Sequence, residues 1–189
     1  MYRVPDVSHG APSPTNAHVV HLYDDRKSLV EAVTAYIGIA LLHGEGALVV
    51  ATPEHRHALS AALSAGGLAL DRLRGTGQYV ELDAEQVLSW ATGPEGVLDV
   101  RLLNDALGDS LDQLVQRWGQ VSVYGDLVAC LWGRGDVLAT VRLERSWNEL
   151  ARSRPVRLYC GYDSIDFADQ GSADEAMQVL TAHSEVRAS

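Results

Sequence analysis

The sequence predicts an α/β fold of three layers, in which a mostly parallel central sheet carries helices on both faces. Short apolar runs alternate with longer segments of helical periodicity along most of the chain. The runs are nearly all apolar, as in strands that are buried on both faces. Parallel strands need crossover helices, and the alternation supplies them at the right spacing. The length of 189 residues and the 47% hydrophobic content suit one sizeable core.

The first predicted strand follows residues 1–16, which hold prolines, serines and a glycine, and which we interpret as a flexible N-terminal arm. Residues 17–25 are an apolar run that ends in two acids, and we predict that this run is the first, central strand of the sheet. Helical spacing begins at once. Asp25 is placed to cap a helix over residues 26–43 through Ser28.

The alternation continues through the middle of the chain. Thr52 is a predicted cap and Pro53 a first-turn proline of the second helix. Further strands are predicted at residues 47–51, 78–82, 121–124 and 156–162. Further helices are predicted from residue 52 to residue 65 and at residues 84–91, 99–118, 126–132 and 136–152, with only a short turn near residues 70–73.

These elements predict one domain over residues 17–167, followed by a polar tail, residues 168–189. The tail is rich in alanine from residue 172 onward, so we expect it to be helical. Nothing in its sequence predicts how it packs on the domain.

Composition excludes several classes of function. The net charge of −10, with a single lysine, opposes direct binding to nucleic acid or to anionic membranes. Cys130 and Cys160 occur in a chain without an apolar secretory segment, which is typical of a reduced, cytoplasmic protein. No apolar run reaches the length of a membrane span.

The ends of the predicted strands suggest a binding site. Parallel strands send their carboxyl ends to one edge of a sheet, where open α/β folds place ligands. We therefore predict a pocket there for a small polar or cationic organic ligand. Its candidate side chains are His21, Tyr23, Asp24, Thr52, Asp126, Cys160 and Tyr162.

Several of these residues have a second interpretation. His21 shares a strand face with Tyr23, whereas His18 lies on the other face and is the better candidate for a structural group. Asp126 is either a ligand-binding carboxylate or the cap of the following helix. Cys160 is a thiol sensor, a polar lining group or an inert buried cysteine.

The sequence opposes a phosphate site. Lys27 and Ser28 resemble the end of a phosphate loop, but no glycine lies between Tyr23 and Ser28. Asp24 and Asp25 would also repel incoming phosphates. We therefore expect neither tight binding nor hydrolysis of ATP.

Metal sites and cofactors are not predicted either. His55 and His57 are two residues apart on a predicted helix and diverge, and His18 and His21 point to opposite faces of one strand. The sequence therefore predicts neither a metal ion nor a cofactor.

A series of short motifs resembles the MEDS domain, a sensory domain of methanogens and methylotrophs, over about residues 17–167. Each motif is weak alone, but their order and separations are specific. Position 126 is Asp where relatives usually have Glu, and His21 stands where glutamine is common. The motifs are His18 with Tyr23, Gly44-Glu45, Thr52-Pro53-Glu54-His55, Gly77-Gln78-Tyr79, Tyr124-Gly125-Asp126, Leu131-Trp132, Leu143-Glu144, Trp147-Asn148 and Cys160-Gly161-Tyr162.

The resemblance implies a RecA/KaiC-like layout without a phosphate loop and a role in signal transduction or transcription regulation. It adds His55, Glu144 and Asn148 to the candidate ligand-binding residues. Glu144 and Asn148 share a helix face, which is otherwise a solvated polar stripe beside Trp147.

The hypothesis is a noncatalytic sensory domain that signals through a protein partner, because the chain shows no appended output module. A kinase, an anti-sigma-type regulator or a second copy of the chain would fit. Two alternatives stay open. One is an enzyme, either a degenerate nucleotide hydrolase or a thiol-dependent catalyst that uses Cys160. The other is an interaction protein with a vestigial pocket.

Overall fold

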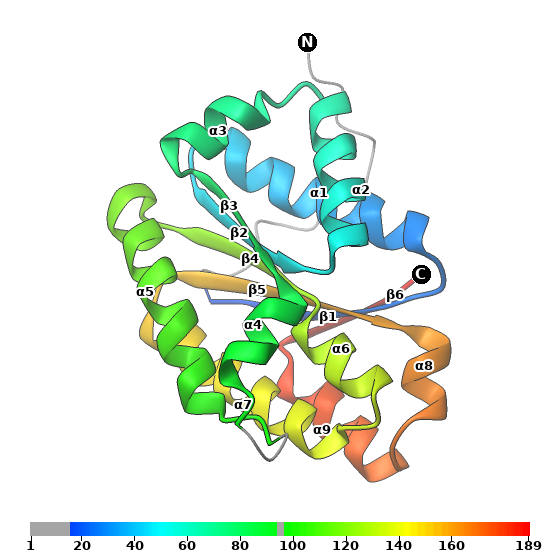
Figure 1. Ribbon diagram of the computed structural model, residues 1–189. Coiled ribbons are helices and arrows are strands. Elements are labelled where there is room, and N and C mark those ends of the chain that lie inside the picture. The colour runs from blue at the N-terminus through cyan, green and yellow to red at the C-terminus, as the bar shows by residue number, and fades with distance from the viewer. Residues whose placement is uncertain (1–15, 94–96) are drawn as a thin grey trace.

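The structure, a computed structural model, describes residues 16–93 and 97–189 (Figure 1), so the predicted arm lies almost wholly outside the described residues. The strands are β1 (His18–Tyr23), β2 (Gly46–Ala51), β3 (Tyr79–Asp83), β4 (Val121–Gly125), β5 (Val156–Asp163) and β6 (Glu185–Ala188). The helices are α1 (Arg26–Leu42), α2 (Pro53–Ala65), α3 (Leu70–Thr76), α4 (Ala84–Ala91), α5 (Val100–Trp118), α6 (Leu127–Gly133), α7 (Val137–Ser153), α8 (Ser164–Asp169) and α9 (Ala173–Ala182).

The strands of the described residues form one six-stranded sheet in the order β3-β2-β4-β5-β1-β6, and every neighbouring pair is parallel. Helices cover both faces (Figure 1), so the predicted α/β fold is confirmed. The central position predicted for the first strand is wrong. β4 and β5 lie at the centre, and β1 is second from one edge. β1 has the apolar sequence of a central strand because β5 and β6 flank it and helices bury both of its faces.

The tail contributes the last strand of the sheet. α9 begins at Ser172, which forms a reciprocal capping box with Glu175, so part of the tail is helical as expected. The chain then pairs β6 with β1, with Val186 opposite Val20. β6 is mostly exposed and carries charged residues, so no apolar run marks it in the sequence.

Short polar side chains begin most of the long helices, as predicted for Asp25 and Thr52. The carboxylate of Asp25, for example, accepts a hydrogen bond from the backbone N–H of Ser28 at 2.8 Å. Where only a turn was predicted near residue 70, the chain forms the short helix α3. No helix in the described ranges has the length and apolarity needed to span a bilayer. The residues that cap helices by accepting backbone hydrogen bonds in this way include Asp25, Thr52, Asp83, Asp99 and Asp136.

Two apolar cores lie on the two sides of the sheet. Helices α1–α3 cover one face, and α4–α9 cover the other (Figure 1). Successive strand residues alternate between them, so that Val19 faces α1 and Val20 faces the α7 side. The same alternation places Cys160 of β5 in the core on the α4–α9 side of the sheet, beneath α7.

Candidate functional site

A small pocket lies at the carboxyl edge of the sheet, where β1, β2, β4 and β5 end. Its volume is about 170 Å³, below the ~300–1,000 Å³ of sites for drug-sized ligands. The predicted site residues that line it are Tyr23, Thr52, His55, Asp126 and Tyr162. The other lining residues are Ala129, Cys130, Trp132, Asp163 and Asp166.

Asp126 connects the elements around this pocket and is only 2% exposed. Its Oδ2 accepts hydrogen bonds from the backbone N–H of Thr52 at 3.0 Å and from Nδ1 of His55 at 2.8 Å. Its Oδ1 accepts a hydrogen bond from the hydroxyl of Tyr124. The side chain makes no capping bond to α6. Asp126 therefore fastens the ends of β2 and β4 to α2.

Carboxylates make the pocket electronegative. Burial raises the pKa of the Tyr23 hydroxyl well above its usual range, and the charges of Asp126, Asp163 and Asp166 act in the same direction. Burial is the largest single effect on His55 and lowers its pKa, but the hydrogen bond to Asp126 and the negative charge of Asp126 together outweigh burial, so the pKa is raised above its usual value. A pocket with these neighbours favours cations over anions.

A second group of predicted residues lies deeper in the protein, between β1, β5 and α7. Glu144 of α7 is fully buried, and its Oε1 accepts a hydrogen bond from the hydroxyl of Tyr162 at 2.5 Å. Its Oε2 lies 3.3 Å from Nε2 of both His18 and His183. The thiol of Cys160 faces the same oxygen at 3.8 Å.

Burial and charge oppose each other within this cluster. Burial alone would raise the pKa of the Glu144 carboxyl, but the facing imidazoles of His183 and His18, when protonated, hold it well below its usual range. Burial and the Glu144 charge raise the pKa of the Cys160 thiol well above its usual value. With these protein neighbours, Cys160 is a thiol rather than the thiolate that a nucleophile requires.

Asn148 and Glu144 share a face of α7, as the sequence indicates, and neither belongs to a solvated stripe. Asn148 is half-buried, and its Oδ1 lies 3.2 Å from Nδ1 of His18. Tyr162 joins the two groups of residues, because its ring lines the pocket while its hydroxyl reaches Glu144.

The predicted pocket residue Cys160 lies in the buried cluster and does not line the pocket. Two further predicted residues, His21 and Asp24, lie outside both the pocket and the cluster. His21 is buried two residues before the end of β1, with its Nε2 3.1 Å from Oγ of Ser189. Burial and the charge of Arg187 lower the pKa of His21. Asp24 is exposed and accepts a hydrogen bond from the Ser164 hydroxyl at 2.8 Å. Several residues at or just beyond the strand ends therefore line the pocket, but the exposed Asp24 and the buried His21 do not.

The sequence did not predict three pocket residues, Asp163, Asp166 and Cys130, nor His183 in the buried cluster. Asp163 ends β5, so the rule that selected Asp24 after the first strand would also have found it. Its carboxylate also caps α8, accepting the backbone N–H of Asp166 at 3.2 Å. His183 follows α9 in the tail, and no motif marks it.

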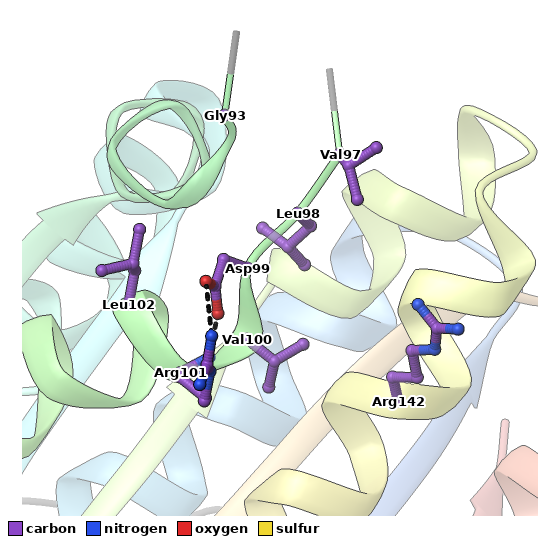
Figure 2. A pocket seen from close by; sticks show the side chains of 8 residues that line it. All are labelled: Gly93, Val97, Leu98, Asp99, Val100, Arg101, Leu102 and Arg142. Carbon is purple, nitrogen blue, oxygen red and sulfur yellow. Dashed lines mark hydrogen bonds and ion pairs between the residues drawn. The ribbon is translucent and has the colours of Figure 1, made fainter. Parts of the chain in front are cut away.

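A wider hollow of about 630 Å³ lies at the start of α5, opposite Arg142 of α7 (Figure 2). Figure 2 shows apolar side chains around it, while Asp99 and Arg101 pair with each other at 3.5 Å. Among the described residues, the lining of this hollow is mainly apolar, with charged side chains only from Asp99, Arg101 and Arg142. Its lining residues are Gly93, Val97, Leu98, Asp99, Val100, Arg101, Leu102 and Arg142.

The fold and these sites define a parallel α/β domain with a polar pocket at the carboxyl edge of its sheet and a buried polar cluster behind it. The family described as MEDS, the MEthanogen/methylotroph, DcmR Sensory domain, matches residues 17–184. The chain belongs to this family, which confirms the resemblance seen in its motifs and implies a sensory or regulatory role. No curated protein matches the chain.

Proposed function

We propose that this sensory domain binds a small organic cation in the pocket at the carboxyl edge of the sheet, and that it is not an enzyme. The observation that carries the proposal is the pocket itself. Asp126, Asp163 and Asp166 converge on it, and the aromatic side chains of Tyr23 and Tyr162 form part of its wall.

The chemistry of the pocket suits an alkylammonium group. Carboxylates attract positive charge, and so do the faces of aromatic rings. An organic cation loses its hydration shell at a lower cost in free energy than a metal ion does, so it is the better match to this pocket. The volume of about 170 Å³ limits the ligand. At ~30 Å³ for each water-sized group, there is room for roughly five non-hydrogen atoms.

Two alternatives fit the pocket less well. A phosphate would meet the same carboxylates, and the β1–α1 turn offers Asp24 and Asp25 instead of a glycine-rich loop. Thiol catalysis would need an accessible thiolate, whereas Cys160 is 4% exposed and its pKa is raised by burial and by Glu144.

The binding test is calorimetric titration of the chain with methylammonium and trimethylammonium, compared with acetate and phosphate. We expect the ammonium ions to bind and the anions not to bind. Asp166→Asn should weaken the binding about tenfold or more, because a charged partner contributes ~1.5–3 kcal/mol. Asp169→Asn, a substitution in the same helix outside the pocket, is the matched control. Equal binding by wild type and Asp166→Asn, or preferred binding of phosphate, would contradict the proposal.

We also propose that the signal passes by contact to a protein partner, such as a kinase or an anti-sigma-type regulator, or to a second copy of the chain. Exposed apolar side chains support such a contact. Val97 and Leu102, at the hollow of Figure 2, are 62% and 52% exposed. Light scattering with and without methylammonium, together with pull-downs from the host, tests this step. A monomer in both conditions that captures no partner would rule it out.

A further inference from the structure

We propose that His18, Glu144, Cys160 and His183 form a closed, four-coordinate site for a divalent transition metal ion, with Zn²⁺ the best match to its donors. Each residue presents one ligand atom, and the four atoms lie within 4.8 Å of one another. The side chains of His18, Glu144 and His183 are 2%, 0% and 0% exposed.

Four of the six separations between the ligand atoms are close to those of a tetrahedral site, and all six lie within 4.8 Å. Zinc bonds of ~2.0–2.3 Å to nitrogen, oxygen and sulfur place neighbouring ligand atoms about 3.3–3.7 Å apart. Glu144 Oε2 lies 3.3 Å from Nε2 of His18, 3.3 Å from Nε2 of His183 and 3.8 Å from Cys160 Sγ. His18 Nε2 lies 3.4 Å from the same sulfur.

Hydrogen bonds outside the cluster assign the tautomers of both histidines. Nδ1 of His183 lies 2.7 Å from the carbonyl oxygen of Val179, which can only accept, so this nitrogen carries the proton. The amide nitrogen of Asn148 donates to the carbonyl of Ala182 at 2.7 Å, which turns its Oδ1 toward Nδ1 of His18. When the two imidazoles are neutral, Nε2 of each therefore has a free lone pair.

Both lone pairs point at a carboxylate oxygen in a space that excludes water. Two imidazole nitrogens, one carboxylate and one sulfur then face each other, and such an arrangement needs positive charge at its centre. Two protonated imidazoles are the competing explanation. However, within the described residues Nε2 of His183 has no hydrogen-bond partner, despite its short distance to Glu144. A metal ion at the centre of the cluster would bind the lone pair of that nitrogen, whereas a proton on the nitrogen would be poorly oriented for a hydrogen bond to Glu144.

The donor set and its surroundings match those of a structural zinc site. Imidazole, thiolate and carboxylate are all zinc ligands, and four protein ligands leave no open position for catalysis. Metal-binding histidines usually donate their other ring N–H to a carbonyl or carboxylate, as His183 does to Val179 and His18 does to the Asn148 amide. Tyr162 donates to Oε1 of Glu144 and leaves Oε2 to the ion.

Metal binding at this site would tie together four segments that are distant in sequence. His18 lies in β1, Glu144 in α7 and Cys160 in β5, while His183 stands between α9 and β6. The ion would hold the start of β6 against the sheet. Because the hydroxyl of Tyr162 binds Glu144 and its ring lines the pocket, metal occupancy would also set the shape of the pocket wall.

The first measurement is the metal content of the full chain, purified without chelators, by inductively coupled plasma mass spectrometry. We expect about one zinc ion per chain, as a closed site requires. Glu144→Gln keeps the side-chain volume but loses a ligand charge, so it should lose the metal. His57→Ala, which changes an exposed histidine of α2, should keep the full metal content. A strong zinc chelator should lower the unfolding temperature of wild type but not that of Glu144→Gln.

Cobalt substitution identifies the ligands even where a variant folds poorly. The chain produced in cobalt medium, or refolded with Co²⁺, should show the visible bands of a tetrahedral ion and a thiolate-to-cobalt charge-transfer band. Cys160→Ser should lose the charge-transfer band, whereas Cys130→Ser should keep it. The charge-transfer band of the wild type alone decides whether a thiolate binds the metal if Cys160→Ser does not fold.

Three results would overturn the proposal. The first is a wild-type chain that is free of metal as purified and also after refolding with excess Zn²⁺ or Co²⁺. The second is a cobalt spectrum that Cys160→Ser leaves unchanged. The third is an unfolding temperature that no chelator alters, which would indicate that protons alone neutralise the cluster.

Discussion

At the scale of single residues, the carboxylate of Asp126 accepts hydrogen bonds from three donors in different parts of the chain. Thr52 follows β2, His55 belongs to α2 and Tyr124 belongs to β4. Because Asp126 is almost fully buried, removing one donor leaves part of a charged group without a partner, which is more costly than losing an exposed hydrogen bond.

The pKa of His55 should lie above its unfolded value of 6.5, because the hydrogen bond to Asp126 and the charge of Asp126 together outweigh the lowering effect of burial. Its other charged neighbours are Arg26, which lowers the pKa, and Glu54, which raises it. Titration of the imidazole signals by NMR, in wild type and in Asp126→Asn, measures the effect. In the variant the pKa should fall, because burial remains while the carboxylate is lost. An unchanged His55 titration curve in Asp126→Asn would contradict the expectation.

The same shift makes the stability depend on pH. A folded pKa above the unfolded one means that the stabilisation is complete below about pH 6.5 and is lost as the pH rises through the folded pKa. At about pH 6, His55→Gln should lower the free energy of unfolding by about 1.5–3 kcal/mol. Chemical denaturation at about pH 9 should give a smaller difference between the two proteins.

At the scale of the elements, the two central strands β4 and β5 carry glycines in different surroundings. A Cβ at Gly161 of β5 would lie 2.9 Å from Cδ1 of Leu29 and 3.4 Å from Cε1 of Tyr23. A Cβ at Gly125 of β4 would have no atom within 4 Å in the described part of the chain. The absence of a side chain at Gly161 therefore lets α1 pack closely on the sheet.

Gly161→Ala should lower the free energy of unfolding by about 1–3 kcal/mol, because the added methyl overpacks a core in which Leu29 is 1% exposed. The matched control is Gly125→Ala, which should be neutral or slightly stabilising, because alanine restricts the unfolded chain. Urea denaturation of the two variants makes the comparison. Equal destabilisation by both substitutions would show that packing against α1 is not the cause.

At the scale of the whole molecule, the sheet separates two apolar cores. Ile37 of α1 is fully buried in one core, and Leu107 of α5 is 1% exposed in the other. Each side chain of the sheet faces one core or the other, so the two helix layers contact the strands rather than each other.

Substitutions in the two cores should therefore be additive. Ile37→Val is expected to cost about 0.5–1.5 kcal/mol and Leu107→Ala about 2–5 kcal/mol. The double variant should match their sum within about 0.3–0.5 kcal/mol, as for distant sites. Denaturation curves of the four proteins test this, with circular dichroism and tryptophan fluorescence giving the same midpoint. A larger coupling energy, or two separate transitions, would mean that the layers are not independent parts of one cooperative unit.

The sequence by itself determined the features that depend on neighbouring residues. Capping at Asp25 and Thr52 depends on side chains that reach only two or three residues along the chain. Apolar periodicity located the long helices and five of the strands, since it records which face of an element is buried. The rule that ligands bind at the carboxyl edge of parallel strands also predicted the part of the pocket that Tyr23, Thr52 and Asp126 supply.

Only the tertiary structure decided which distant segments meet. The strand order, the pairing of β6 with β1 and the position of β1 near an edge arise from packing of the complete chain, which leaves no local pattern. The cluster of His18, Glu144, Cys160 and His183 is the clearest case. Spacing along the chain argued against metal sites formed by histidines that are close in sequence. Metal coordination, however, depends on the distances between ligand atoms in space. The four residues come together because β1 pairs with β5 and because α7 and the end of α9 pack over these strands.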